Sequence, residues 1–140
     1  LHDIGVHFFY DPDGLDKKDY ITHGLRGYEL LKKEGFDDVL CNFSLHHTGV
    51  GITKEDVISQ KLPMPIADYL PTTLEERIVT YADKFHSKGQ HLIFNTTKYY
   101  EQFLLEKFGE SKLKAFQALK AEFGVPDLQP LIAKYQHPVR

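Results

Sequence analysis

The stretch TTLEERIVTYADKFHSKG, residues 72–89, decides the fold class. Two overlapping Thr-x-x-Glu pairs open it at residues 72–76, and this spacing is typical of a capping box at the start of a helix. Apolar residues then recur every three or four positions, which predicts a helix with one apolar face. The residues on this face are Leu74, Ile78, Ala82 and Phe85. Gly89 is expected to end the helix.

The same reading predicts helices along most of the chain. THGLRGYELLKKEG (22–35) begins at Thr22 as N-cap and stops at Gly35, and DDVLCNFSLHH (37–47) stops before two glycines. Further helices are expected at 53–56 in brief form, at 97–108, from Ser111 to Gly124, and at 127–136. LPMPIADYLP (62–71) has three prolines and predicts a loop, while QHLIFNT (90–96) fits either a loop or a short extended piece. The expected class is all-α, a compact multi-helix bundle.

Length, charge and cysteine content limit the classes of protein to which this chain can belong. The chain has 140 residues, enough for a single domain with its own core. Its net charge of −3 disfavours a nucleic-acid-binding face, and its one cysteine fits a reducing compartment. No apolar run approaches the ~20 residues that span a bilayer. We expect a cytoplasmic protein that does not bind membranes or nucleic acid.

Histidines and aspartates are placed at the ends of these elements. His23 follows the Thr22 cap, where the positive end of a helix favours a neutral, ligating imidazole. His46 and His47 are expected at the end of their helix, where two consecutive side chains can converge on one point. His2, Asp3 and Asp83 complete the set. Imidazole and carboxylate together suit a first-row transition metal better than Mg²⁺ or Ca²⁺.

Four pieces in order make the chain similar to a known family. LHDIG (1–5), THGLRGYELL (22–31), LHH (45–47) and YADKF (81–85) resemble the HD-domain superfamily of metal-dependent phosphohydrolases, and more narrowly its small prokaryotic members with an HDIG signature. The resemblance covers about residues 1–89 and implies a metal site between helices, with residues 90–140 as packing or oligomerisation helices. The family's first histidine comes from a helix before the HD pair, and we expect that helix to be missing here.

The resemblance also implies a ligand set. One metal would be held by His2, Asp3 and Asp83. A second would be held by Asp3, His23, His46 and His47, with Asp3 bridging the two ions. Divalent Fe, Mn, Ni, Co or Zn would fit, as one ion or two. Asp3 and Lys84 are the candidate catalytic residues, Lys84 because it adjoins a ligand and could contact a substrate phosphate.

Taken singly, each of these residues has a simpler structural explanation, and their ordered combination favours the metal site. The resemblance therefore implies hydrolysis of a phosphomonoester or phosphodiester, in a nucleotide or related small metabolite, by metal-activated hydroxide. Two alternatives stay open: a di-iron oxygenase of the same superfamily, and a catalytically weak metal or nucleotide sensor. A homo-oligomer is a further expectation that the sequence leaves open.

Overall fold

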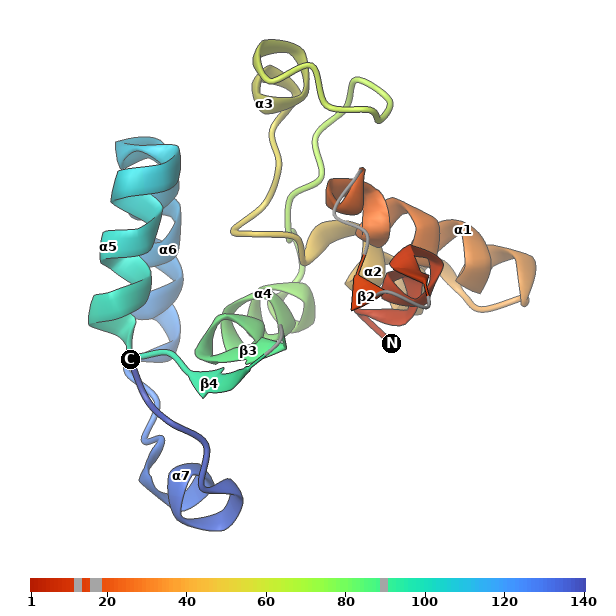
Figure 1. The fold of residues 1–140 in the computed structure, drawn as a ribbon. Helices are drawn as coiled ribbons and strands as arrows, with labels where there is room; N and C mark the ends of the chain where they lie inside the picture. The colour runs from red at the N-terminus through yellow and green to blue at the C-terminus, as the bar shows by residue number, and fades with distance from the viewer. Residues whose placement is uncertain (12–13, 16–18, 89–90) are drawn as a thin grey trace. The chain divides into compact units, whose positions relative to one another are not determined.

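Helices dominate the structure, a computed structural model that describes residues 1–11, 14–15, 19–88 and 91–140 (Figure 1). The described strands form two antiparallel pairs, β1–β2 and β3–β4. The all-α class is thus confirmed. None of the helices formed by the described residues has the length and apolar character needed to cross a membrane. The chain divides into two units, Leu1–Thr80 and Tyr81–Arg140, which are described in turn.

The first unit is built from short helical elements around a pair of longer helices. Its elements are η1 (Ile4–Phe9), β1 (Tyr10–Asp11), β2 (Gly14–Leu15), η2 (Tyr20–Thr22), α1 (His23–Lys33), α2 (Asp38–His46), α3 (Lys54–Ser59) and most of α4 (Leu74–Ala82). Asp37 caps α2 by accepting a hydrogen bond from the Leu40 backbone N–H at 2.9 Å. The Thr22 hydroxyl does not cap α1 as predicted, because it donates instead to the Asp19 carbonyl at 2.8 Å.

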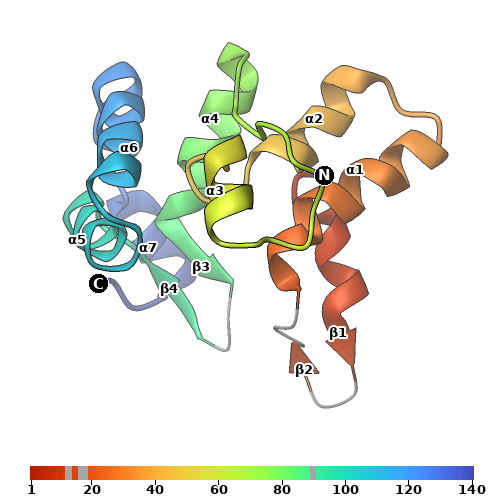
Figure 2. The same cartoon turned by 90° about the horizontal axis from the view of Figure 1, so that it is seen from above.

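Glycines bring η1, α1 and α2 almost into backbone contact (Figure 2). A Cβ atom at Gly5 would overlap the His23 carbonyl oxygen, and one at Gly27 would overlap the Ser44 hydroxyl. A Cβ atom at Gly24 would lie 2.6 Å from the Ser44 carbonyl oxygen. Glycine inside a helix costs about 1 kcal/mol relative to alanine. The chain accepts this cost because these glycines allow η1, α1 and α2 to approach one another closely.

The segment after α2 forms a small apolar cluster that carries α3. Ile52 and Tyr69 bridge the two ends of this segment, with backbone hydrogen bonds of 3.0 and 2.8 Å. Ile52, Val57 and Tyr69 are buried together, and Leu45 of α2 packs against them. The predicted brief helix is confirmed, and Thr53 and Asp56 form its capping box.

Helix α4 is shorter than predicted, and its buried residues are mostly polar. It ends at Ala82, and the chain continues as η3 (Asp83–Phe85) and β3 (His86–Lys88), so the prediction of one helix through this stretch is wrong. The predicted stop at Gly89 lies outside the described residues. Leu74 and Ile78 are 49% and 46% exposed, so the predicted apolar face is wrong at these two residues, whereas its last member, Phe85, is buried. Glu76, Thr80 and Tyr81 are the buried residues of α4, and apolar periodicity cannot identify the two polar side chains among them.

The second unit combines a β-hairpin with α-helices. Strand β3 pairs with β4 (Leu92–Phe94), which settles the ambiguous stretch as extended at these residues. Asn95 accounts for the early end of the preceding helix, since its backbone N–H donates to the Phe85 carbonyl at 2.9 Å and its side chain donates to the Lys84 carbonyl at 2.8 Å. The remaining elements are α5 (Thr97–Phe108), α6 (Glu110–Phe123) and α7 (Gln129–Tyr135), close to the predicted bounds.

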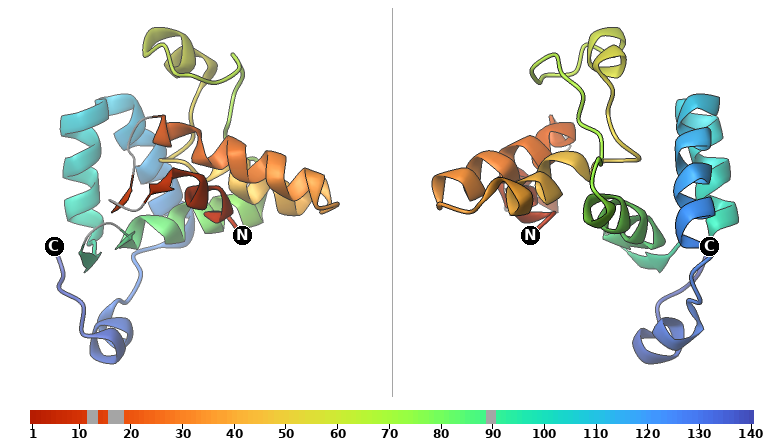
Figure 3. Two further views of the ribbon diagram at one scale, coloured as in Figure 1. Left: turned by 45° about the vertical axis from the view of Figure 1, so that its right-hand side comes forward. Right: turned by 180° about the vertical axis from the view of Figure 1, so that it is seen from behind.

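Aromatic rings form the core of this second unit. Helices α5 and α6 lie side by side (Figures 1 and 3), and Phe116 of α6 is fully buried. Its ring centroid lies 5.4 Å from that of Tyr81, 6.3 Å from that of Phe85 and 5.0 Å from that of Tyr100. Burial raises the pKa of the Tyr100 phenol far above its usual value, and the nearby Asp83 carboxylate adds to this shift.

Candidate metal centre

Three predicted ligands meet in the first unit: Asp3 just before η1, His23 at the start of α1 and His47 just after α2. The Nε2 atoms of His23 and His47 lie 3.0 Å apart. The Oδ1 atom of Asp3 lies 3.2 Å from His47 Nε2 and 3.9 Å from His23 Nε2. His23 and His47 are buried, with 6% and 2% of their surface exposed, while Asp3 is half-buried. The three side chains therefore aim their ligand atoms at one small volume.

Backbone carbonyls fix the tautomer of both histidines. His23 Nδ1 lies 2.8 Å from the Tyr20 carbonyl oxygen, and His47 Nδ1 lies 2.7 Å from the Ser44 carbonyl oxygen. A carbonyl oxygen only accepts, so each Nδ1 carries the proton and each neutral ring presents an Nε2 lone pair. The Tyr20 ring stacks on His23 at 4.6 Å between centroids and holds the imidazole plane. Both rings are thus oriented with their acceptor nitrogens toward Asp3.

This donor set fits a divalent transition metal. Two neutral imidazole nitrogens and a carboxylate oxygen are all acceptors, and they repel one another unless a cation or protons lie among them. About 2.0–2.1 Å separates a histidine nitrogen from bound zinc, so two such nitrogens at tetrahedral or right angles lie about 2.8–3.4 Å apart. The observed spacing of 3.0 Å between His23 and His47 falls in that range. Hydrogen bonds from Nδ1 to carbonyl oxygens are also typical of metal-bound histidines.

The second oxygen of Asp3 faces another predicted ligand. Asp3 Oδ2 lies 3.3 Å from His2 Nε2, whereas Oδ1 faces the two buried histidines. The His2 carbonyl oxygen accepts from the Ser44 hydroxyl at 3.0 Å, which ties the HD pair to α2. The two oxygens of Asp3 thus face different histidines. This arrangement is compatible with the bridging role that the family resemblance implies, and that role stays a prediction.

His46 does not join this group of three. Its Nδ1 lies 3.0 Å from Oε2 of Glu76 on α4, so the two adjacent histidines point to different partners. Glu76 is 3% exposed. Burial opposes ionisation of its carboxyl, but hydrogen bonds from the Thr72 backbone and from His46 outweigh burial and hold the pKa of Glu76 below its usual value. The role of His46 as a ligand stays a prediction.

Asp83 and Lys84 belong to η3 in the second unit. They form an ion pair, with 2.8 Å between Lys84 Nζ and Asp83 Oδ2, and Lys84 is 5% exposed. The two units are described separately, so the predicted approach of Asp83 to Asp3, and the predicted catalytic role of Lys84, both stay predictions.

Sequence reasoning missed the residues that support the ligands. Gly5, Gly24 and Gly27 allow the close packing, and Gly24 with Gly27 inside one helix was a readable signal, because helices rarely tolerate two glycines without a packing reason. Glu76 fitted a capping box, and this ordinary explanation hid its contact with His46. Nothing in the sequence pattern indicates the Ser44 carbonyl as the partner of His47.

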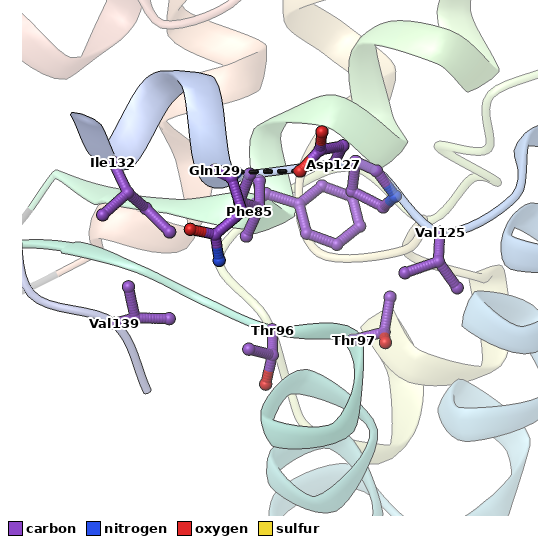
Figure 4. Close-up of a pocket in the computed structure, with 10 residues that line it drawn as sticks. Phe85, Thr96, Thr97, Val125, Asp127, Gln129, Ile132 and Val139 are labelled. Atoms are coloured by element: carbon purple, nitrogen blue, oxygen red, sulfur yellow. Dashed lines mark hydrogen bonds between the residues drawn. The ribbon is translucent and has the colours of Figure 1, made fainter. Parts of the chain in front are cut away.

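Two pockets lie away from these ligands. One, of about 560 Å³, is in the first unit between η1 and α1 and is lined by His7, Phe8, Phe9, Arg26, Glu29, Leu30 and Lys33. The other, of about 230 Å³, lies in the second unit beside Phe85 and the segment before α7 (Figure 4). None of the predicted ligands lines either pocket. The pockets therefore add no residue to the candidate centre.

Comparison with known proteins gives three informative relatives. An uncharacterised protein of Methanocaldococcus jannaschii is 38% identical over 120 residues, which is 86% of this chain and 60% of the relative. A tRNA (cytidine(56)-2′-O)-methyltransferase of Picrophilus torridus is 42% identical over 87 residues, 62% of this chain and 22% of that protein. The protein of the same name in Thermoplasma volcanium is 35% identical over 92 residues, 66% of this chain and 24% of that protein. The chain thus spans less than two thirds of the length of each relative.

The family assignment rests on a match of another kind. No solved structure matches the chain significantly. The family model of the HD domain, however, matches residues 1–88, and this stretch contains all of the predicted ligands. The chain therefore belongs to the HD domain family, a superfamily of metal-dependent hydrolases.

Proposed function

We propose that this protein hydrolyses a phosphomonoester or phosphodiester, in a nucleotide or related small metabolite, with one or two divalent transition-metal ions. The observation that carries the proposal is the facing pair of His23 and His47, whose Nε2 atoms lie 3.0 Å apart beside the Asp3 carboxylate. Both rings are held in the ligating tautomer by backbone carbonyls. Buried, neutral and oriented imidazoles of this kind bind a cation without first having to rearrange.

The candidate ligands fall into a group of three that lie together and a group of further candidates. His23, His47 and Asp3 would hold one ion, and His2, Asp83 and His46 are the further candidates. A bound divalent metal lowers the pKa of a coordinated water from ~15.7 toward about 7 and so supplies hydroxide at neutral pH. Asp3 presents one oxygen to the two buried histidines and the other to His2. It would therefore orient groups on both of its sides.

Lys84 is the candidate for contact with the substrate phosphate. Its ammonium carries three N–H donors and lies 2.8 Å from the Asp83 carboxylate, which would hold it beside a ligand. A fixed positive charge beside a phosphoryl group would offset the negative charge that develops during in-line attack. Lys84→Met is expected to reduce kcat by more than it changes metal affinity.

The names of two relatives affect only the choice of substrates to test. The matching stretch in those proteins belongs to chains named for methylation of tRNA, and it covers 22% and 24% of them. Methyl transfer is not proposed for this chain. RNA-derived nucleotides nevertheless belong in the substrate panel, beside simple phosphate esters and free nucleotides.

The test is turnover by the full chain after metal removal and reloading. Protein loaded in turn with Mn²⁺, Ni²⁺, Co²⁺, Fe²⁺ or Zn²⁺ is assayed on the panel, with metal content measured on the same samples. We expect release of phosphate or a monoester by at least one metal form and loss of it in His47→Gln. His91→Gln is the matched control, because His91 is exposed and lies in the second unit. Full metal occupancy without turnover of any substrate would overturn the proposal.

A further inference from the structure

Glu76 is a buried carboxylate that receives more hydrogen bonds than a helix cap requires. Its Oε2 accepts from the Thr72 backbone N–H at 2.8 Å, from the Thr72 hydroxyl at 3.3 Å and from His46 Nδ1 at 3.0 Å. Only 3% of the residue is exposed. Burying an ionised carboxylate is costly unless its partners compensate. The site therefore maintains a negative charge next to His46.

Capping of α4 does not explain this arrangement. The Thr73 hydroxyl already accepts from the Glu76 backbone N–H at 3.2 Å, as the first half of a capping box does. The Glu76 side chain then reaches past Thr73, to Thr72 and to His46 on another helix. Glutamates that only cap a helix have no reason to be buried. A contact between elements 30 residues apart points to a function of its own.

The carboxylate determines which nitrogen of His46 is available. An ionised carboxylate only accepts, so His46 Nδ1 carries the proton and Nε2 keeps its lone pair. The partners of His23 and His47 are neutral carbonyl oxygens, whereas the partner of His46 carries a full charge. A carboxylate partner makes an imidazole a stronger base and a stronger ligand. Among the three oriented imidazoles, His46 is thus the one whose Nδ1 partner is a carboxylate.

We infer that Glu76 is a positioning residue that holds His46 as a metal ligand through Nε2. The inference rests on the proposed metal-dependent function and adds to it a residue that supports the predicted ligand. It also accounts for the different directions of two adjacent histidines, because His47 is oriented by its own helix and His46 by α4. Helix α4 thereby supports the metal site through Glu76, which orients a ligand and does not itself bind the ion.

The test measures metal affinity rather than turnover. Co²⁺ is titrated into the metal-free full chain, and the dissociation constant and the visible absorption of bound Co²⁺ are recorded. Glu76→Gln keeps the size of the side chain and removes its charge, and we expect about 10- to 100-fold weaker binding of the ion that His46 ligates. His46→Gln should show the same loss and the same spectral change. The double variant should bind no more weakly than His46→Gln alone, because Glu76 acts through His46.

Thr73→Ala is the matched control for helix stability. It removes the hydroxyl that accepts from the Glu76 backbone N–H and leaves the Glu76 side chain and its bond to His46 in place. We expect a lower melting temperature with unchanged Co²⁺ affinity. If Glu76→Gln does not fold, His46→Gln still tests whether His46 binds metal.

The His47→Gln variant distinguishes a failure of the Glu76 inference from a failure of the proposed metal centre. Loss of binding in His47→Gln, with wild-type affinity and spectrum in both His46→Gln and Glu76→Gln, would overturn this inference and leave the proposed function standing. Wild-type binding by His47→Gln would instead overturn the proposed centre itself. Additive losses in the double variant would show that Glu76 does not act through His46 and would also contradict the inference.

Discussion

The two units of this protein differ in their internal packing. In the first unit, η1, α1 and α2 approach closely through glycines, and the polar side chains of Asp3, His23 and His47 meet in the same unit. In the second, bulky rings gather around Phe116 of α6. Glycine contacts bury little apolar surface, whereas each ring contributes a large buried area. The comparison indicates that the glycine contacts of the first unit serve to place ligands, whereas the ring contacts of the second unit serve stability.

Phe116→Ala is expected to have the largest effect on stability. The side chain is fully buried, and its loss should lower the free energy of unfolding by about 3–5 kcal/mol. Urea denaturation followed by circular dichroism measures this change. The Asp3–His23–His47 group contains no residue of the second unit, so the affinity for the ion that these three residues hold should be unchanged under native conditions. A loss below about 1 kcal/mol would contradict the assignment of the aromatic cluster as the main core of that unit.

Gly5→Ala is expected to be less destabilising but more damaging to the site. The added methyl group would meet the backbone of His23 and Gly27, which cannot move aside as a side chain can. Overpacking of this kind costs about 1–3 kcal/mol. The backbone around residue 5 would have to shift and would move Asp3 away from His23, so metal affinity should fall as well.

Gly35→Ala provides the comparison for Gly5→Ala. Gly35 has a φ of 84° and no neighbour within 4 Å of an added Cβ, so the cost there is backbone strain of about 1–2 kcal/mol. Calorimetric metal titration of the two variants should show weakened binding only for Gly5→Ala. Equal metal affinities would mean that close packing does not place the ligands.

Much of this architecture could be predicted from the sequence. The all-α class, the bounds of α5 and α6 and the capping box at Thr53 all follow from local patterns. Local patterns failed where a distant segment decides the outcome. Asn95 takes up the carbonyls of Lys84 and Phe85 and thereby ends the helix that periodicity extends beyond Ala82.

The candidate site was predictable as a set of residues but not as a geometry. The ordered motifs identified Asp3, His23 and His47, which lie together. They could not show that His46 turns toward Glu76, because that contact depends on how α4 packs against α2. Adjacent residues at the end of a helix can converge or diverge, and only the packing partners decide which.

Thr53→Ala is expected to have a smaller, local effect within the first unit. The Thr53 hydroxyl accepts from the Asp56 backbone N–H at 3.1 Å, and its loss should cost about 1 kcal/mol. Hydrogen exchange should then be faster in α3 and unchanged in α1. Faster exchange throughout the first unit would indicate that the apolar cluster around Val57 and the metal site unfold together.

Cys41 is expected to show the smallest effect, a low reactivity. Its side chain is fully buried, and burial raises the pKa of the thiol, so little thiolate forms at neutral pH. A disulfide reagent should modify it slowly in the native protein and rapidly in urea. Rapid modification in the native state would show that the contact between α1 and α2 opens readily.

The central claim is that Asp3, His23 and His47 form a metal centre, and a crystal structure of the Co²⁺-loaded full chain tests it most directly. The account predicts an anomalous-scattering peak within about 2.0–2.2 Å of the Nε2 atoms of both histidines and of an Asp3 carboxylate oxygen. A fully loaded protein whose anomalous peak lies away from these three side chains would contradict the account.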